Sequence, residues 1–173
     1  MENKQLENKH FKYDIKQFKL DLIFGFCAVI SFAIDQFTKK LVIDNIPVDG
    51  KIELIPDFLY ITHIKNSGAA FGILQNHTDI FIIISFIAII LILVLKVTLS
   101  INSVAYNLAL GLILGGAVGN LFDRFLLGEV TDFIYFTFFA VFNGADSFIV
   151  IGFFILAMVL IKNFLKKDKD VKE

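Results

Sequence analysis

Four aspartates of this 173-residue chain, Asp35, Asp123, Asp132 and Asp146, fall at or just beyond the ends of its long apolar stretches. A carboxylate at the edge of a lipid bilayer is costly unless it is paired or used, so ionisable residues in such places are candidate functional residues. The spacing of the apolar stretches places all four at one side of a predicted membrane domain. We therefore expect them to meet there.

Other catalytic chemistries find little support in the residues. The histidines His10, His63 and His77 are scattered, and no two of them have the i, i+4 spacing of a metalloprotease helix, so neither a metal ion nor a cofactor is expected. Cys27 is alone in an apolar stretch, which argues against a disulfide or a thiol nucleophile. Ser147 lies outside any Gly-x-Ser-x-Gly turn. Carboxylate chemistry remains.

The composition predicts that the elements which position these carboxylates are membrane helices. Hydrophobic residues make up 57% of the chain, including 21 Phe, which is more apolar surface than a soluble domain of this length buries. Four stretches are long enough to cross a hydrocarbon core of about 30 Å, which takes about 20 helical residues. They are residues 20–43, 80–97, 104–122 and 145–161. The first is too long for a cleavable signal peptide and runs directly into Asp35 and Lys39.

Lysines flank the membrane domain at both ends. They are Lys4, Lys9, Lys12, Lys16 and Lys19 before the first span, and Lys162, Lys166, Lys167, Lys169 and Lys172 after the last. Positive charge favours the cytoplasmic side, and an even number of spans puts both termini on one side. We therefore predict an all-α membrane protein with four transmembrane helices and cytoplasmic termini. A nucleic-acid-binding tail is the weaker interpretation, and no nucleic-acid partner is expected.

This topology divides the chain into a cytoplasmic basic segment (1–19), a four-helix membrane domain (20–164) and a cytoplasmic charged tail (165–173). Loops 44–79 and 124–144 would lie outside. Within the first loop, residues 51–64 carry β-branched and aromatic residues around a proline, which predicts short strands or a hairpin on the membrane. The loop ends in small residues at 66–72, and the third span is rich in Gly and Ala, which favours close helix packing.

Helical spacing groups several polar residues. Asn120, Asp123 and Arg124 stand at i, i+3 and i+4 at the end of the third span, so they are expected to share one face. Three of the charged residues also have a simpler, structural interpretation. Asp123 and Arg124 could form an ordinary interfacial ion pair, and Asp146 could cap the fourth helix. Asp132 lies in an aromatic stretch without a local basic partner, which favours a functional role for it.

Five ordered motifs resemble the signature boxes of the lipoprotein signal peptidase (signal peptidase II) family. They are Asp35-Gln-Phe-Thr-Lys39, Asn66-Ser-Gly-Ala-Ala-Phe-Gly72, Gly119-Asn-Leu-Phe-Asp-Arg124, Val130-Thr-Asp-Phe-Ile134 and Phe142-Asn-Gly-Ala-Asp-Ser147. The resemblance covers about residues 34–147. It departs from the family at Gly144, where an aliphatic residue is usual, and in a shorter connection between Asp132 and Asp146.

The resemblance implies a multi-pass aspartic peptidase of the bacterial cytoplasmic (inner) membrane, with its active site near the outer leaflet and no cofactor. Such an enzyme removes the signal peptide of prolipoproteins by cutting before a diacylglyceryl-modified cysteine, so its partners are these substrates and membrane lipids. On this resemblance Asp132 and Asp146 match the catalytic dyad. The residues that match positions lining or bracing the site are Asn66, Gly68, Asn120, Arg124, Asn143 and Ala145, with Asp35, Lys39 and Asp123 as its structural polar set.

Two other functions fit intramembrane polar residues. A proton-coupled carrier or channel distributes its acidic residues through the depth of the bilayer, whereas here the carboxylates cluster at one side and the second span offers no polar path. A structural membrane scaffold would use the motifs for helix packing alone. Neither alternative predicts five motifs in this order.

Overall fold

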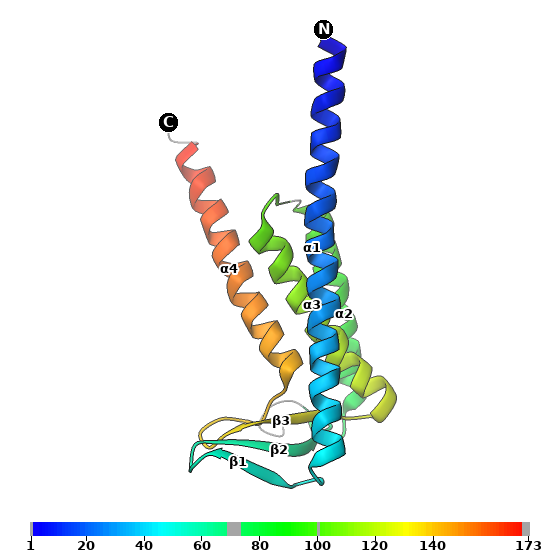
Figure 1. The fold of residues 1–173 in the computed structure, drawn as a ribbon, viewed down its shortest axis with the longest axis vertical. Helices are drawn as coiled ribbons and strands as arrows, with labels where there is room; N and C mark the ends of the chain where they lie inside the picture. Colours follow the sequence, from blue (N-terminus) through cyan, green and yellow to red (C-terminus); the bar gives the residue numbers. More distant parts are fainter. Residues whose placement is uncertain (1, 69–73, 100, 171–173) are drawn as a thin grey trace.

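The computed structural model describes residues 2–68, 74–99 and 101–170. Its elements are, in order, α1 (Glu2–Asn45), β1 (Lys51–Ile55), β2 (Leu59–Asn66), α2 (Thr78–Thr98), α3 (Val104–Leu127), β3 (Val130–Phe136) and α4 (Gly144–Asp170). Both termini lie at one end of the helix bundle, and the three strands lie across the other end (Figure 1). The chain thus returns its two termini to the same side.

Four helices among the described residues are long and apolar enough to cross a membrane, which confirms the predicted spans. Their apolar segments are Ile15–Asn45, Thr78–Thr98, Val104–Leu127 and Gly144–Asp168. Large apolar side chains on their outer faces are exposed, such as Phe26 on α1 and Phe153 on α4. In lipid such a surface needs no protein partner. Helix α1 also extends further than the predicted span, because the basic N-terminal segment continues it as helix.

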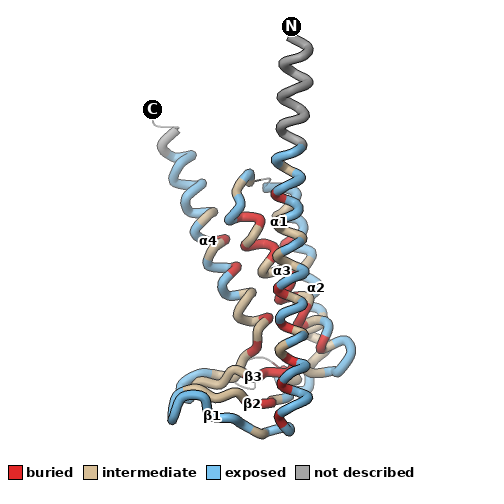
Figure 2. Tube along the Cα trace, in the orientation of Figure 1, coloured by how far each residue is buried: buried red, intermediate tan, exposed pale blue. Residues whose placement is uncertain are grey.

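Helix α3 is the central packing element. It contacts α1, α2 and α4, and buried residues follow it through the bundle (Figure 2). The small residues of α3 allow the neighbouring helices to pack close to it. A Cβ at Gly116 would stand 2.5 Å from the backbone oxygen of Ala145 on α4, and one at Gly111 would stand 2.6 Å from that of Phe24 on α1. Interfaces of small residues are how helices pack closely in lipid, as the sequence predicts.

Replacing Gly115 by alanine is expected to destabilise the bundle. An added Cβ would overlap both Ser31 Oγ and the backbone oxygen of Ala28, so α1 and α3 must move apart. We expect the loss of about 1–3 kcal/mol that overpacking typically causes, measured as a lower Tm in detergent. Gly25→Ala is the matched control, because nothing lies within 4 Å of its added Cβ. An equal effect of the two substitutions would contradict this packing.

The strands form one antiparallel sheet in the order β1-β2-β3. Strands β1 and β2 confirm the hairpin predicted in the first outer loop. Strand β3 was not predicted, although its β-branched and aromatic residues are typical of a strand. Asp132 lies on β3 opposite Ile64 of β2. The aspartate is therefore held by a sheet and not by a flexible loop.

A tight return joins β3 to α4. The amide N–H of Phe139 donates to the backbone oxygen of Phe136 at 3.0 Å, and the chain then runs back along β3. There Phe142 pairs with Ile134, donating to its oxygen at 3.1 Å and accepting from its N–H at 2.8 Å. This return ends directly before Asn143. The short connection between Asp132 and Asp146 is therefore long enough to place one beside the other.

Candidate functional site

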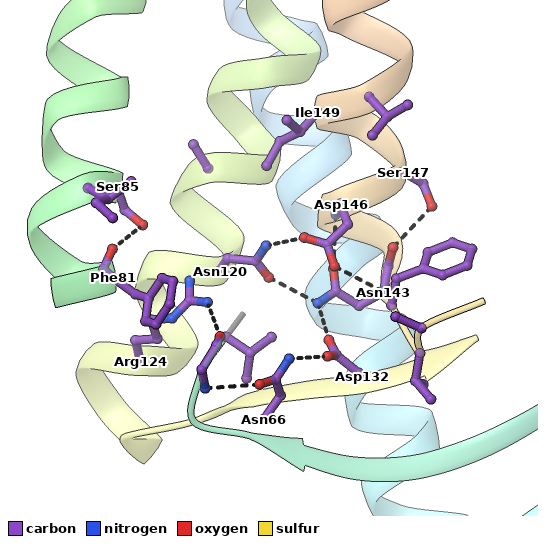
Figure 3. Close-up of a pocket in the computed structure, with 18 of the residues that line it drawn as sticks. Asn66, Phe81, Ser85, Asn120, Arg124, Asp132, Asn143, Asp146, Ser147 and Ile149 are labelled. Atoms are coloured by element: carbon purple, nitrogen blue, oxygen red, sulfur yellow. Dashed lines mark hydrogen bonds between the residues drawn. The ribbon is translucent and has the colours of Figure 1, made fainter. Parts of the chain in front are cut away.

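A cavity of about 750 Å³ lies at the sheet end of the bundle, between α2, α3, α4 and β3 (Figure 3). Its amide and charged side chains come from β2, α3, β3 and the start of α4 and converge on one end: they are Asn66, Asn120, Arg124, Asp132, Asn143 and Asp146. Its other walls are apolar. Phe81, Ile84 and Ala88 of α2 form one of them, and Ile149 and Val150 of α4 form another. The cavity is an apolar chamber with a polar end.

Asp132 is buried and holds two hydrogen bonds from asparagine amides. Asn66 Nδ2 donates to its Oδ2 at 2.7 Å, and Asn143 Nδ2 donates to its Oδ1 at 2.7 Å. Asn66 is itself fixed, because its Oδ1 accepts from the N–H of Gly68 at 2.9 Å. The carboxyl group thus lies in a low-dielectric setting with a defined orientation.

Asp146 lies in the first turn of α4 and pairs with Asn143, the residue that caps the helix. Its Oδ2 accepts from the N–H of Asn143 at 3.3 Å, while Asn143 Oδ1 accepts from the N–H of Asp146 at 3.0 Å. This reciprocal pair is a capping box in which Asn143 is the N-cap residue and Asp146 is the third helical residue, so Asp146 supports the helix start without being the cap itself. Its other oxygen, Oδ1, accepts from Asn120 Nδ2 at 2.7 Å and faces the cavity. Asn143 therefore contacts both aspartates.

Burial raises the pKa of Asp132 to about 6, from an ordinary value of 3.8. Loss of hydration is the largest cause, because the ionised form loses most when water is removed. The charge of Asp146 raises the pKa further, while the hydrogen bonds from Asn66 and Asn143 lower it. A carboxyl group with this pKa holds its proton more readily than an exposed aspartate does.

The raised pKa of Asp132 makes the stability of the folded protein depend on pH. The folded state binds the proton of Asp132 more tightly than the unfolded state does, so this proton adds to the free energy of unfolding. That contribution is fully present below pH 3.8 and is lost as pH rises through about 6. Between pH 4.5 and 7.5 we expect the protein to lose about 2 kcal/mol relative to Asp132→Asn, which has no group to titrate there. Tm measured at both pH values for both proteins checks this. Equal pH slopes would contradict it.

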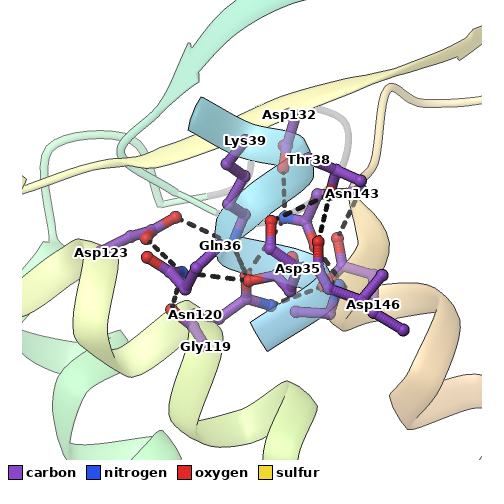
Figure 4. A network of polar contacts seen from close by, with 12 residues as sticks. Asp35, Gln36, Thr38, Lys39, Gly119, Asn120, Asp123, Asp132, Asn143 and Asp146 are labelled. Atoms are coloured by element: carbon purple, nitrogen blue, oxygen red, sulfur yellow. Dashed lines mark hydrogen bonds and ion pairs between the residues drawn. The ribbon is translucent and has the colours of Figure 1, made fainter. Parts of the chain in front are cut away.

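A second buried network lies beside the first (Figure 4). Lys39 Nζ on α1 contacts Asp35 Oδ2 at 2.8 Å and Asp123 Oδ2 on α3 at 2.8 Å, and all three residues are buried. Gln36 joins them, donating to Asp123 Oδ1 at 2.9 Å. Asp35 Oδ1 also accepts from the N–H of Ala145 at 2.8 Å, which ties α1 to the start of α4. Two carboxylates and one ammonium group thus join three helices.

Asp123 and Arg124 do not share one face as the spacing suggested. Successive helical residues are turned by about 100°, so Asp123 faces α1 while Arg124 faces the cavity beside α2. The guanidinium group of Arg124 lies 5.0 Å from the ring centroid of Phe81, and its Nη2 donates to the oxygen of Gly68 at 3.4 Å. Asp123 and Arg124 therefore do not form the ion pair that the sequence suggested: Asp123 pairs with Lys39, and Arg124 lies over Phe81.

The structure brings together the polar residues that the motifs selected, with Ala145 buried where α4 meets α1 and α3. Residues 69–73 of the second motif lie outside the described part of the chain. Gln36 lies within the first motif but was given no role. The apolar wall from α2 was not predicted, since an Ile/Leu/Phe helix gives no signal for which face lines a cavity. Within residues 15–68, 74–99 and 101–168, no three His, Cys, Asp or Glu side chains are grouped to hold a metal ion.

Comparison with known proteins gives matches over most of the chain. Residues 27–162 match a family described as signal peptidase (SPase) II. A lipoprotein signal peptidase of Caldanaerobacter subterraneus is 47% identical over 137 residues, which are 78% of this chain and 94% of that protein. One from Brevibacillus brevis is 43% identical over 83% of this chain and 95% of the relative. One from Staphylococcus aureus is 40% identical over 84% and 92%.

Solved structures give the same result for the fold. A bacterial membrane enzyme determined by the in meso method at 2.3 Å resolution superposes with a TM-score of 0.76 at 36% identity, over 82% of this chain and 89% of that chain. A second, at 1.9 Å resolution, gives a TM-score of 0.72 at 36% identity, over 79% and 91%. The four-helix arrangement with its small sheet is therefore shared with enzymes of bacterial membranes.

Proposed function

Because this chain belongs to the signal peptidase II family, we propose that it is an aspartic endopeptidase whose dyad is Asp132 and Asp146. Membership of this family gives the general activity: the protein is a multi-pass bacterial membrane peptidase that removes signal peptides from lipoproteins. The observation that carries the aspartic mechanism is the pair of carboxyl groups at the polar end of the cavity, both in contact with Asn143.

The chemistry follows from the different settings of the two carboxyl groups. Asp132, with its pKa near 6, supplies the proton of the pair. Asp146 lies at the positive end of the α4 dipole and accepts from Asn120 and Asn143, so we assign it the role of the base. Ionised Asp146 takes a proton from water as the water oxygen bonds to the scissile carbonyl carbon. Neutral Asp132 hydrogen-bonds the carbonyl oxygen, and one of the two protons then moves to the leaving amine nitrogen as the C–N bond breaks.

The substrate we propose is a prolipoprotein that carries diacylglycerol on the cysteine after the cleavage point. The cavity has apolar walls from α2 and α4, and α3 lies between these two helices. A signal helix could therefore enter sideways from lipid, with the acyl chains remaining in the bilayer. Ala88 of α2 and Ala117 of α3 leave room in the chamber for small side chains before the cleavage point.

We further propose that the sheet end faces the outer leaflet of the cytoplasmic membrane and that residues 1–19 and 165–173 are cytoplasmic, flanking the membrane domain 20–164. The lysine clusters at both ends of the chain support this sidedness. A reporter fused after Lys169 is expected to be cytoplasmic, and one inserted beside the exposed Asp57 is expected to be external. Labelling of both on the same side would overturn this orientation.

The experiment that tests the function is cleavage of a lipidated precursor by the purified protein. We expect a product that begins with the diacylglyceryl cysteine, identified by mass spectrometry. EDTA is expected to leave the rate unchanged, since the proposed dyad needs no metal ion. Loss of activity with EDTA would contradict the dyad chemistry. Absence of cleavage by a folded protein would favour a carrier or a scaffold.

A further inference from the structure

The amide of Asn120 connects the two buried networks. Its Oδ1 accepts from Lys39 Nζ at 3.1 Å and from Asn143 Nδ2 at 3.1 Å, while its Nδ2 donates to Asp146 Oδ1 at 2.7 Å (Figure 4). An ammonium group only donates, so it cannot face the NH₂ group of the amide. Lys39 therefore favours the orientation in which the NH₂ group of Asn120 is turned to Asp146.

The other two asparagines of the site are oriented in the same way, but by backbone groups. The N–H of Gly68 holds Asn66 Oδ1, and the N–H of Asp146 holds Asn143 Oδ1. Both contacts are local in sequence and belong to the folded backbone. Asn120 is the member of this set that is oriented by a charged side chain from another helix. Charge-assisted hydrogen bonds are roughly twice as strong as neutral ones, so Lys39 dominates over Asn143 in setting this amide.

We propose that Lys39 is a positioning residue for peptide cleavage: through Asn120 it keeps a hydrogen-bond donor on Asp146 and so keeps Asp146 the ionised member of the dyad. This inference rests on the proposed function. A donor favours the charged form of a carboxyl group, whereas a reversed amide would present an oxygen and favour the protonated form. A protonated Asp146 cannot take the proton of the attacking water.

Other charged and titratable groups surround this amide, and they have to be separated from Lys39 in any test. They are Asp35 on α1, Asp123 and Arg124 on α3, Asp132 on β3 and Asp146 on α4. From α2 the cavity receives Phe81 and Ser85, which carry no charge. Asp123 contacts Lys39 and Gln36 in the same buried cluster. Neutralising Asp123 therefore separates the effect of Lys39 on Asn120 from its pairing with this carboxylate.

The test is a double-mutant cycle between Lys39 and Asn120, made in an Asp123→Asn background. In this background, removing the lysine leaves only Asp35 as a buried carboxylate that has lost its contact with Lys39, instead of both Asp35 and Asp123. We expect Lys39→Met to lower kcat about 10-fold when Asn120 is present, as loss of one hydrogen bond to a charged group predicts. With Asn120→Ala in place we expect less than about a 2-fold further loss. KM should stay constant, and the acid limb of the kcat profile should move up by about one pH unit.

Two further variants keep the test decisive. Lys39→Arg in the same background retains a charged donor and is expected to restore the acid limb. Lys39→Gln in the same background keeps a side chain of similar length without the positive charge. Its acid limb should also move to higher pH, and this variant carries the test if Lys39→Met does not fold. Additive losses in the cycle, or an acid limb that stays unmoved when the positive charge at position 39 is removed, would overturn the role of Lys39. If Asp132→Asn and Asp146→Asn were active, the proposed function itself would fail.

Discussion

Asparagine at position 132 or at position 146 is expected to lower kcat/KM by about 10⁴-fold, the upper end of the range for general acid–base catalysis. Each substitution keeps the shape of the side chain and removes its ability to take or give a proton. In the proposed mechanism one carboxyl group activates water and the other polarises the carbonyl, so neither can replace the other. The measurement is cleavage of a lipidated precursor by purified protein, with Tm recorded for each variant.

Asp44→Asn is the matched control for these two substitutions. Asp44 lies at the sheet end of α1, half exposed, where it pairs with Lys40 at 2.9 Å. Exposed ion pairs contribute about 0–1 kcal/mol, so this variant should keep its activity within about 2-fold. Near-normal turnover by either Asp132→Asn or Asp146→Asn would show that the dyad is assigned wrongly.

Precursor that lacks diacylglycerol is expected to be cleaved about 100-fold less efficiently than the same peptide with it. Acyl chains anchored in the bilayer hold the cysteine at the depth of the sheet end, so the scissile bond spends more time beside the dyad. The comparison needs both forms in the same vesicles, because the signal peptide itself also binds lipid. Rates at substrate concentrations below KM give the ratio directly.

Two outcomes of that comparison carry different conclusions. Cleavage of the lipidated form alone, before its cysteine, supports the proposed prolipoprotein substrate. Equal cleavage of both forms would mean that the cavity recognises the peptide without its lipid, and the protein would then be a general aspartic peptidase of the membrane. Asp146→Asn in parallel reactions shows that either activity belongs to this site.

The helices were predictable because lipid imposes a simple pattern on the sequence. A span such as α2, in which Ser85 is the single polar residue between Ile80 and Leu95, leaves no other interpretation. The β1–β2 hairpin was also predictable, from β-branched residues around a proline. Strand β3 was not, because its residues were judged as the surroundings of Asp132 and because its pairing partner, β2, is distant in sequence.

The site was predictable as a set of residues but not as an arrangement. The resemblance to a family selected Asn120 and Asn143, whereas spacing alone gave neither their amide orientations nor the partners of Asp123. Those depend on where α1 passes α3, which no local pattern in the sequence determines. Helical spacing even suggested a wrong grouping of Asp123 with Arg124. Gln36 was given no role for the same reason, since its partner Asp123 lies on another helix.

The bond between Asp35 and the N–H of Ala145 has a consequence for the order of synthesis. It joins α1 to α4, and the contact of Asn143 with Asp146 also needs the first turn of α4 in place. A nascent chain that has inserted α1, α2 and α3 holds Asp132 but lacks its partner carboxylate. The proposed catalytic pair is therefore complete only once the start of α4 has joined α1 and β3.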